Sequence, residues 1–315
     1  MGVFIGMDEA GYGPNLGPLV VTATVWELPD HPRRYDLWSA QADVIDQRPP
    51  RNSSCLHVAD SKQVYNSAQG IGPLEKSVLS ALSLCDALPA SFRKLARWLT
   101  GEPRPPLDGE PWLDDSDLDL PHTAVRQQCV EMGTRWSECC REHGIRLKRI
   151  ASEIVLTERF NRLTREYGTK GMVLSRLSLR LLKSVWNREA DGPTLIVADK
   201  HGGRNRYDLL LSEILDGQMI FRQQESRACS RYRVGSTEIC FQTKAESHCP
   251  VALASMVSKY VRELAMMLFN QFWSRQVAGI KPTKGYPVDA LRFKKDVAEA
   301  RARLGIADEL FWRIR

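Results

Sequence analysis

The sequence lacks the features of a membrane, secreted or zinc-binding protein. No apolar run reaches the length that spans a bilayer, so we expect no membrane partner. The eight cysteines form no C-x-x-C pair and no disulfide framework, which favours reduced thiols in a cytoplasmic protein over a zinc site. Acidic side chains stand near the first residue, where a signal peptide needs an apolar stretch, so we expect no secretion.

Two common phosphate-binding loops are also missing. Gly6 and Gly11 have the Walker spacing, but Tyr12 and Gly13 stand where Lys and Ser or Thr are required. Three residues rather than two separate Gly13 from Gly17, so the dinucleotide-binding fingerprint does not fit either. Neither loop therefore explains why glycine is so frequent in this stretch.

The composition is that of a globular chain of one large or two modest domains, with 315 residues of which 43% are hydrophobic and 26% charged. The net charge of +6 is unevenly distributed, because residues 101–120 alone contain seven acids and one arginine. We expect this acidic stretch to be an exposed, solvated loop or insertion, with a role in covering a basic cleft as the second possibility. The basic remainder fits an anionic partner such as nucleic acid.

The first residues combine a buried-strand pattern with paired acids. The apolar residues 3–7 lead into Asp8 and Glu9, and a turn rich in Gly and Pro follows. Two anions at the edge of a core are unfavourable unless a cation compensates them, and a hard divalent metal held by oxygen atoms would do so. The alternative is that the pair begins a solvated loop. The glycines at 11, 13 and 17 favour a ligand, because they let backbone N–H groups approach a phosphate or sugar.

Two further acids stand at comparable places. Residues 193–199 form a second apolar run that ends in Asp199, and the Gly- and Arg-containing tract from His201 to Arg206 follows it. Glu246 precedes a helical pattern over residues 250–273, where it could simply interact with the helix dipole. Residues 19–26 are rich in β-branched side chains and predict a strand that pairs with the first one as a hairpin. Strands that end in acids point to one sheet edge where these acids converge.

Five blocks of sequence, taken in order, carry a family resemblance. They are Asp8-Glu9-Ala10-Gly11-Tyr12-Gly13-Pro14-Asn15-Leu16-Gly17-Pro18, Asp60-Ser61-Lys62, Asp199 at a strand end, Lys244-Ala245-Glu246 with the helical residues 251–263 behind it, and Lys284-Gly285-Tyr286-Pro287-Val288-Asp289. Together they resemble the motifs of the type 2 ribonucleases H, the HII and HIII branches. Tyr12 stands where the HII branch usually has Arg or Lys. Glu246 is closer to the HIII pattern, so the preference between the two branches stays open.

The resemblance implies an α/β fold of the ribonuclease H-like kind, with a mixed five-stranded sheet flanked by helices and a C-terminal helical part. We expect residues 1–273 to form the catalytic domain, with an insertion around 100–150. Residues 274–315 would be a C-terminal extension that carries the Gly-Tyr-Pro segment and a helix. The implied activity is hydrolysis of the RNA strand of RNA–DNA hybrids, or of ribonucleotides embedded in duplex DNA, giving 3′-hydroxyl and 5′-phosphate ends.

The resemblance also implies roles for individual residues. Asp8, Glu9, Asp199 and Glu246 would hold two Mg²⁺ or Mn²⁺ ions, which suits a ligand set made only of carboxylates. By resemblance, the backbone of Gly11, Tyr12 and Gly13 and the side chain of Tyr286 would meet the ribose. Candidate phosphate contacts are Ser61, Lys62 and Lys259, and further ones are Arg204 and Arg206, whose tract has no counterpart in the family.

Several alternatives stay open at this point. Tyr286 could be an ordinary half-buried turn residue, and Lys259 could be a solvated lysine on a helix face. His201 and His248 each lie two residues from a proposed ligand, where proton transfer and incidental placement are both possible. The whole chain, which we expect to be a monomer, could instead bind nucleic acid without cutting it, or be a DNA or junction nuclease of the ribonuclease H-like superfamily.

Overall fold

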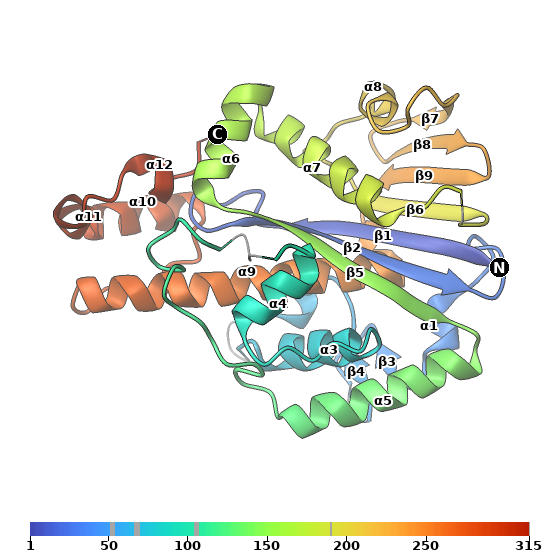
Figure 1. Cartoon of the computed structure of the whole chain (residues 1–315), viewed down its shortest axis with the longest axis horizontal. Helices are drawn as coiled ribbons and strands as arrows, with labels where there is room; N and C mark the ends of the chain where they lie inside the picture. The colour runs from blue at the N-terminus through green and yellow to red at the C-terminus, as the bar shows by residue number, and fades with distance from the viewer. Residues whose placement is uncertain (51–53, 66–69, 104–106, 190, 315) are drawn as a thin grey trace.

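The computed structural model describes residues 1–50, 54–65, 70–103, 107–189 and 191–314. A mixed sheet of seven strands runs through its centre in the order β5-β2-β1-β6-β9-β8-β7 (Figure 1). The strands are β1 (Gly2–Ala10), β2 (Leu19–Leu28), β5 (Arg146–Val155), β6 (Thr194–Asp199), β7 (Phe221–Glu225), β8 (Cys229–Val234) and β9 (Thr237–Gln242). Two shorter strands, β3 (Ile45–Asp46) and β4 (Leu56–His57), pair separately.

The predicted hairpin of β1 and β2 is confirmed, and the two strands pair antiparallel along their whole length. On its other side β1 runs parallel to β6, which in turn runs parallel to β9. The last pair in register between β1 and β6 is Met7 with Ala198. Asp8 and Asp199 are therefore the next residues on two neighbouring parallel strands, at the same edge of the sheet.

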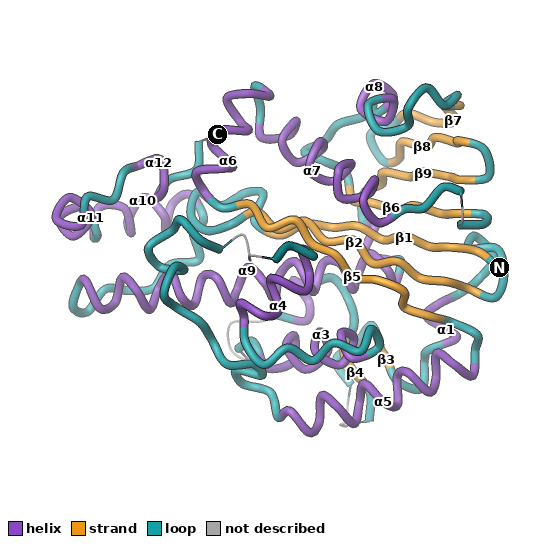
Figure 2. The backbone as a smooth tube through the Cα atoms, viewed as in Figure 1, coloured by secondary structure: helices purple, strands orange, loops and turns teal. Residues whose placement is uncertain are grey.

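Helices cover both faces of the sheet, as Figure 2 shows. Side chains alternate along β1, so Phe4 and Ile5 join different hydrophobic cores. The core on the Phe4 side contains α9 with α3 and α5 beyond it, and the core on the Ile5 side contains α6, α7 and α8. The helices are α1 (Leu37–Ala40), α2 (Ser61–Val64), α3 (Gly72–Ser83), α4 (Phe92–Thr100), α5 (Arg126–Glu142), α6 (Thr157–Tyr167), α7 (Lys170–Val185), α8 (Asp208–Ser212), the 3₁₀ turn η1 (Ala245–Ser247), α9 (Cys249–Gln276), α10 (Pro287–Asp296), α11 (Ala298–Leu304) and α12 (Asp308–Phe311).

The start of α9 lies unusually close to β1. A Cβ atom on Gly6 would stand 2.2 Å from the carbonyl carbon of Pro250 and 2.4 Å from the nitrogen of Val251, so only glycine fits at this crossing. The Thr24 hydroxyl on β2 donates to the Pro250 carbonyl at 2.8 Å, which ties the helix start to the sheet. This close approach holds η1, and with it Glu246, beside the strand ends.

The prediction of five strands is wrong in number, because β8 and β7 extend the sheet beyond β9. In β8 the buried side chains of Ser230, Tyr232 and Val234 alternate with more exposed ones, but arginines interrupt the apolar pattern. The edge strand β7 is polar and almost wholly exposed. Because an edge strand is held mainly by backbone pairing on one side, its sequence carries little of the hydrophobic signal that predicts a strand.

The acidic stretch of residues 101–120 also differs from its prediction as a solvated loop. Trp112 is 2% exposed and packs edge-on against Phe269 of α9 and Phe311 of α12, with ring centroids 5.0 and 6.4 Å apart. Glu110 is buried as well and accepts hydrogen bonds from the Trp112 indole at 2.7 Å and from the Thr157 backbone at 2.8 Å. The exposed acids of this stretch therefore surround an apolar anchor that joins α6, α9 and α12.

We expect Trp112→Ala to lower the free energy of unfolding by about 3–5 kcal/mol, as for other large buried aromatic side chains. The substitution also removes a donor from the buried Glu110 carboxylate. Urea denaturation followed by circular dichroism measures the effect. Asp115→Asn, at an exposed position of the same stretch, is the matched control and should shift stability by less than about 0.5 kcal/mol. Equal stability of the two variants would show that the stretch is not anchored.

The remaining segments refine two other expectations. Residues 146–155 are edge strand β5 of the main sheet, so the region around 100–150 is not wholly outside it. Three short helices, α10 to α12, follow α9 where the sequence predicts one.

Within the described residues, no helix combines the length and apolarity that crossing a bilayer requires.

Candidate metal and nucleic-acid site

The four predicted acids lie around one edge of the sheet. Asp8 and Glu9 are at the end of β1, Asp199 is the last residue of β6, and Glu246 is in η1, directly before α9. All four side chains are partly exposed. The fold therefore brings together carboxylates that are up to 238 residues apart in the chain.

Burial and mutual repulsion shift the titration of these acids. Burial raises the pKa of Asp8 to about 7; a hydrogen bond with Ser255 partly offsets this, and the charges of Asp199 and Glu246 add to it. Burial, then the charges of Asp8 and Asp199, hold the pKa of Glu9 well above its usual range. The pKa of Asp199 is also raised, by burial and by Glu246. These carboxylates thus repel one another, and the positive charge around them is too small to compensate their negative charges.

A divalent cation fits this donor set. All the candidate ligands are carboxylate oxygens, which Mg²⁺ and Mn²⁺ prefer, and a bound cation would relieve the repulsion that raises these pKa values. In the described part of the chain no three His, Cys, Asp or Glu side chains are arranged as a finished metal site. The four acids are neighbours, but their side chains would have to move to complete the coordination shell of a bound metal ion.

Hydroxyl groups on α9 fix the end of β1. The Ser258 hydroxyl donates to the Asp8 carbonyl at 3.2 Å and to Thr22 at 2.7 Å. Ser255, one turn earlier, is hydrogen-bonded at 3.1 Å to the hydroxyl of Ser61. The predicted Ser61 therefore lies next to the acid cluster, buried at the start of α2. Ser255 and Ser258 are functional candidates that the sequence analysis did not single out.

The glycine-rich turn after β1, residues 11–17, is held by two buried arginines. Arg313 is 2% exposed, and its guanidinium donates to the carbonyls of Gly11, Pro14 at 2.8 Å and Gly17 at 3.2 Å. Arg262, on α9, donates to the Leu16 carbonyl at 3.1 Å. Burial beside Arg262 lowers the pKa of Arg313 to about 9, and the Glu110 carboxylate partly offsets this.

This arrangement decides which way the peptide units of the turn face. Because the carbonyls of Gly11 and Tyr12 point toward Arg313, the N–H groups of the next residues, Tyr12 and Gly13, point away from it. Neither of these two N–H groups donates to another described residue. Gly11 has φ of +93°, and a Cβ atom there would lie 2.3 Å from the Pro18 carbonyl oxygen, so this turn requires glycine. The turn therefore presents two outward-facing donors.

The two candidate tyrosines lie on different sides of this turn. A Cβ atom on Gly13 would be 3.9 Å from the Tyr286 ring, and Tyr286 is 51% exposed at the start of α10. Tyr12 instead faces α7 and the loop after β6: the Lys170 ammonium lies 4.6 Å from its ring centre, and its hydroxyl would be 2.6 Å from a Cβ on Gly202. Tyr286 thus lies beside Gly13, and its role as a ribose contact stays a prediction.

The two lysines predicted to contact phosphates differ in exposure and in ion pairing. Lys62, at the start of α2, is exposed, and the charges of Asp60, Asp8, Glu246 and Asp199 raise its pKa. The Lys259 side chain is only 15% exposed, and its ammonium pairs with Glu263 at 2.6 Å, above the ring of Tyr65. Lys62 remains a candidate phosphate contact beside the acids, whereas the charge of Lys259 is engaged within the protein.

The two histidines near the acids have structural environments. His201 is 3% exposed; its ring is within hydrogen-bond distance of Ser175 at 3.2 Å and packs against Tyr207 and Phe241. Burial lowers its pKa to about 3, so it is neutral. The His248 ring packs against Phe4, and burial lowers its pKa as well. Incidental placement is thus the better interpretation for His201.

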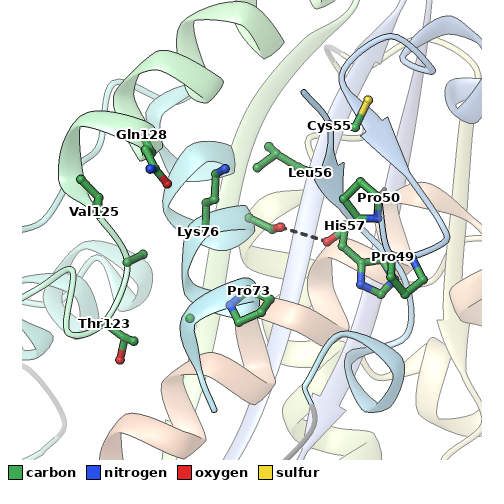
Figure 3. Close-up of a pocket in the computed structure, with 13 residues that line it drawn as sticks. Pro49, Pro50, Cys55, Leu56, His57, Pro73, Lys76, Thr123, Val125 and Gln128 are labelled. Carbon is green, nitrogen blue, oxygen red and sulfur yellow. Dashed lines mark hydrogen bonds between the residues drawn. The ribbon is translucent and has the colours of Figure 1, made fainter. Parts of the chain in front are cut away.

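A cavity of about 420 Å³ lies elsewhere, between β4, the start of α3 and the start of α5 (Figure 3). Pro73 and Lys76 line one side, Val125 and Gln128 a second, and His57 a third, as the figure shows. None of the residues that line it is an acid, so it lacks the donors that define the site at the sheet edge.

Of the comparisons with known proteins, the one with solved structures bears on the fold. No model of a protein family matches the sequence, and no curated protein does. Among solved structures, ribonuclease H2 from Pyrococcus horikoshii OT3 matches with a TM-score of 0.51 and 16% identity, over 98% of this chain and 92% of that one. Ribonuclease HII from Archaeoglobus fulgidus, solved in complex with PCNA, matches with a TM-score of 0.47 and 15% identity, over 99% and 94%. The chain has the ribonuclease H-like fold, as predicted.

Proposed function

We propose that the protein is a metal-dependent endonuclease of the type 2 ribonuclease H kind, which cleaves the RNA strand of RNA–DNA hybrids or ribonucleotides embedded in duplex DNA. The observation that carries the proposal is the meeting of Asp8, Glu9, Asp199 and Glu246 at one sheet edge, beside a turn with two backbone N–H groups that donate to no described residue. The ribonuclease H-like fold and the five sequence blocks support it. The basic charge of the chain outside residues 101–120 suits the polyanionic substrate.

In this proposal each group has a separate task. Asp8, Glu9, Asp199 and Glu246 would hold two divalent ions, which when bound activate water and stabilise the leaving oxygen at the scissile phosphate. The N–H groups of Tyr12 and Gly13, with the Tyr286 side chain, would contact the ribose 2′-hydroxyl, which distinguishes RNA from DNA. Lys62 would contact a phosphate next to the acids. The product ends would be 3′-hydroxyl and 5′-phosphate.

The crowded acids weigh against a protein that only binds nucleic acid. Four carboxylates beside the phosphates of a bound strand would repel it unless cations were held between them. A DNA or junction nuclease would share the metal site but would not need donors directed at a 2′-hydroxyl. The turn at residues 11–13 therefore favours a ribose-reading enzyme among the three alternatives.

A panel of labelled duplexes tests the proposal. We expect cleavage of an RNA–DNA hybrid or of a DNA duplex with one ribonucleotide, in Mg²⁺ or Mn²⁺, and none after addition of EDTA. An all-DNA duplex of the same sequence should stay intact, and 2′-O-methyl substitution at the cleaved residue should block cutting. Cleavage of the all-DNA duplex alone would contradict ribose reading. Tight binding without cleavage of any duplex would favour the binding protein.

A further inference from the structure

Lys200 joins two loops beyond the acid cluster into one unit. Its side chain, 8% exposed, donates to the Arg204 carbonyl at 3.1 Å and the Asn205 side chain at 3.1 Å in the loop after β6. The Ser226 carbonyl at 2.6 Å and the Ser230 hydroxyl at 2.9 Å, at the turn between β7 and β8, are also within hydrogen-bond distance, so the four oxygen atoms share the three N–H bonds of the ammonium. A fully engaged, buried ammonium of this kind fixes both loops in one relative position.

The unit lies at the same sheet edge as the acids. Asp199 pairs with Gln242 on β9, and Gln242 pairs with Cys229 on β8, so these three residues form a row across the sheet. The turn before Cys229 bonds back to β9 through the Thr243 N–H and the Ala228 carbonyl at 2.9 Å. Two strand spacings, about 10 Å, thus separate Asp199 from this turn along the edge.

Two exposed arginines project from this unit. The Arg206 side chain is 80% exposed, with only a loose contact of 3.7 Å to Glu225. Arg227 is exposed in the β7–β8 turn and makes no hydrogen bond or ion pair with another described residue. Arg204 lies between them and the acids; its guanidinium is directed at the Met172 sulfur, so it is less free than the other two.

We propose that Arg206 and Arg227, the arginine shelf, form a second phosphate-binding site that holds the duplex beyond the cleaved linkage, on the side of the acids where β8 and β7 extend the sheet. The inference rests on the proposed function and adds a substrate subsite to it. Phosphates succeed one another by about 3.4 Å along the axis of each strand. The turn that carries Arg227 begins about 10 Å from Asp199, so the shelf reaches a phosphate within about three nucleotides of the cleaved one.

The experiment compares the wild-type full chain with a double variant that carries both Arg206→Ala and Arg227→Ala. It measures duplex binding and cleavage for each protein. Removing the shelf should raise KM about fivefold or more and leave kcat within about twofold, because neither side chain touches the reacting atoms. The slope of log Kd against log salt should fall by about one for each lost phosphate contact. Arg34→Ala is the matched control, since Arg34 is exposed beside the opposite end of β1, where Pro32 contacts Gly2.

Neutral methylphosphonate linkages locate the contact. In an Asp8→Asn background, fluorescence anisotropy should show that a neutral linkage about three nucleotides from the cleavage position, on one side, weakens binding. The same linkage should have no further effect once Arg206 and Arg227 are replaced. If replacing Arg206 and Arg227 leaves the affinity, the salt slope and the sensitivity to these linkages unchanged, while the wild-type protein cleaves the hybrid, the shelf is wrong and the proposed function stands. If the wild-type protein binds no duplex, both fall.

Discussion

Asp8→Asn should reduce cleavage of an RNA–DNA hybrid at least about a thousandfold in saturating Mg²⁺. Asp8 is the only proposed ligand whose backbone is also fixed by α9, through the Ser258 hydroxyl, and its side chain interacts with both Asp199 and Glu246. Replacing it removes one negative charge and one ligand oxygen from the middle of the set. A loss of several kcal/mol of transition-state stabilisation corresponds to this factor. Single-turnover cleavage with enzyme in excess measures the chemical step directly.

The same substitution should make the metal-free protein more stable. Since burial and neighbouring charges raise the pKa of Asp8 to about 7, above the value of 3.8 for a free carboxyl, ionised Asp8 destabilises the fold. This destabilisation grows as the pH rises from about 4 to 7 and is complete above that range. In EDTA, Asp8→Asn should therefore raise the melting temperature, and more so at pH 8 than at pH 5.

Mg²⁺ should stabilise the two proteins to different extents. It should raise the melting temperature of the wild-type protein more than that of Asp8→Asn, because only the wild type has the full ligand set. Asp115→Asn, which removes an exposed charge far along the chain from all four acids, should change neither cleavage nor the response to Mg²⁺. A variant that is as active as the wild type would remove Asp8 from the site, whatever its stability.

The acids could be located from sequence because their signals are local. An apolar run followed at once by a carboxylate predicts a strand end, and parallel neighbours bring such ends together, as β1 and β6 do for Asp8 and Asp199. Two strands that end in acids already pointed to a shared sheet edge. Glu246 differs, because its place before a helical pattern is equally explained by the helix dipole, and only the family resemblance assigned it to the site.

The parts that sequence reasoning missed depend on distant contacts or on misleading composition. Arg313 supports a turn about 300 residues earlier in the chain, and nothing near residue 313 indicates this partner. Because Trp112 stands among acids in the sequence, its stretch was predicted to be a solvated loop, but the Trp112 side chain is buried in the core. Strand β7 is polar because it is an edge strand. Arg262 did leave a signal, since it follows Ser255 and Ser258 at helical spacing on the face of α9 turned to β1.

Arg313→Lys should lower kcat/KM on a ribonucleotide-containing duplex about a hundredfold, although residue 313 touches none of the acids. The guanidinium fork spans the turn from the Gly11 to the Gly17 carbonyl, and a lysine can place only one ammonium there. Peptide units between Gly11 and Gly13 would then be free to rotate, and the Tyr12 and Gly13 N–H groups would lose their fixed direction. Misplacement of a contact by about 1 Å can reduce catalysis by this amount.

Two causes would lower the activity of Arg313→Lys: N–H groups of the turn that no longer have a fixed direction, or a less stable fold. A choice of substrates distinguishes these two causes. Lysine keeps a positive charge near Glu110, so the variant should stay folded, with a melting temperature only a few degrees lower. Arg301→Lys is the control: Arg301 bonds to the Ile306 carbonyl at 3.2 Å in the same segment without touching the turn. If residue 313 directs the ribose-reading donors, Arg313→Lys should also lose discrimination against a 2′-deoxy substrate, which offers the N–H groups of the turn no acceptor oxygen. Arg301→Lys should keep that discrimination. A uniform loss on all substrates in both variants would reduce Arg313 to a residue that only stabilises the fold.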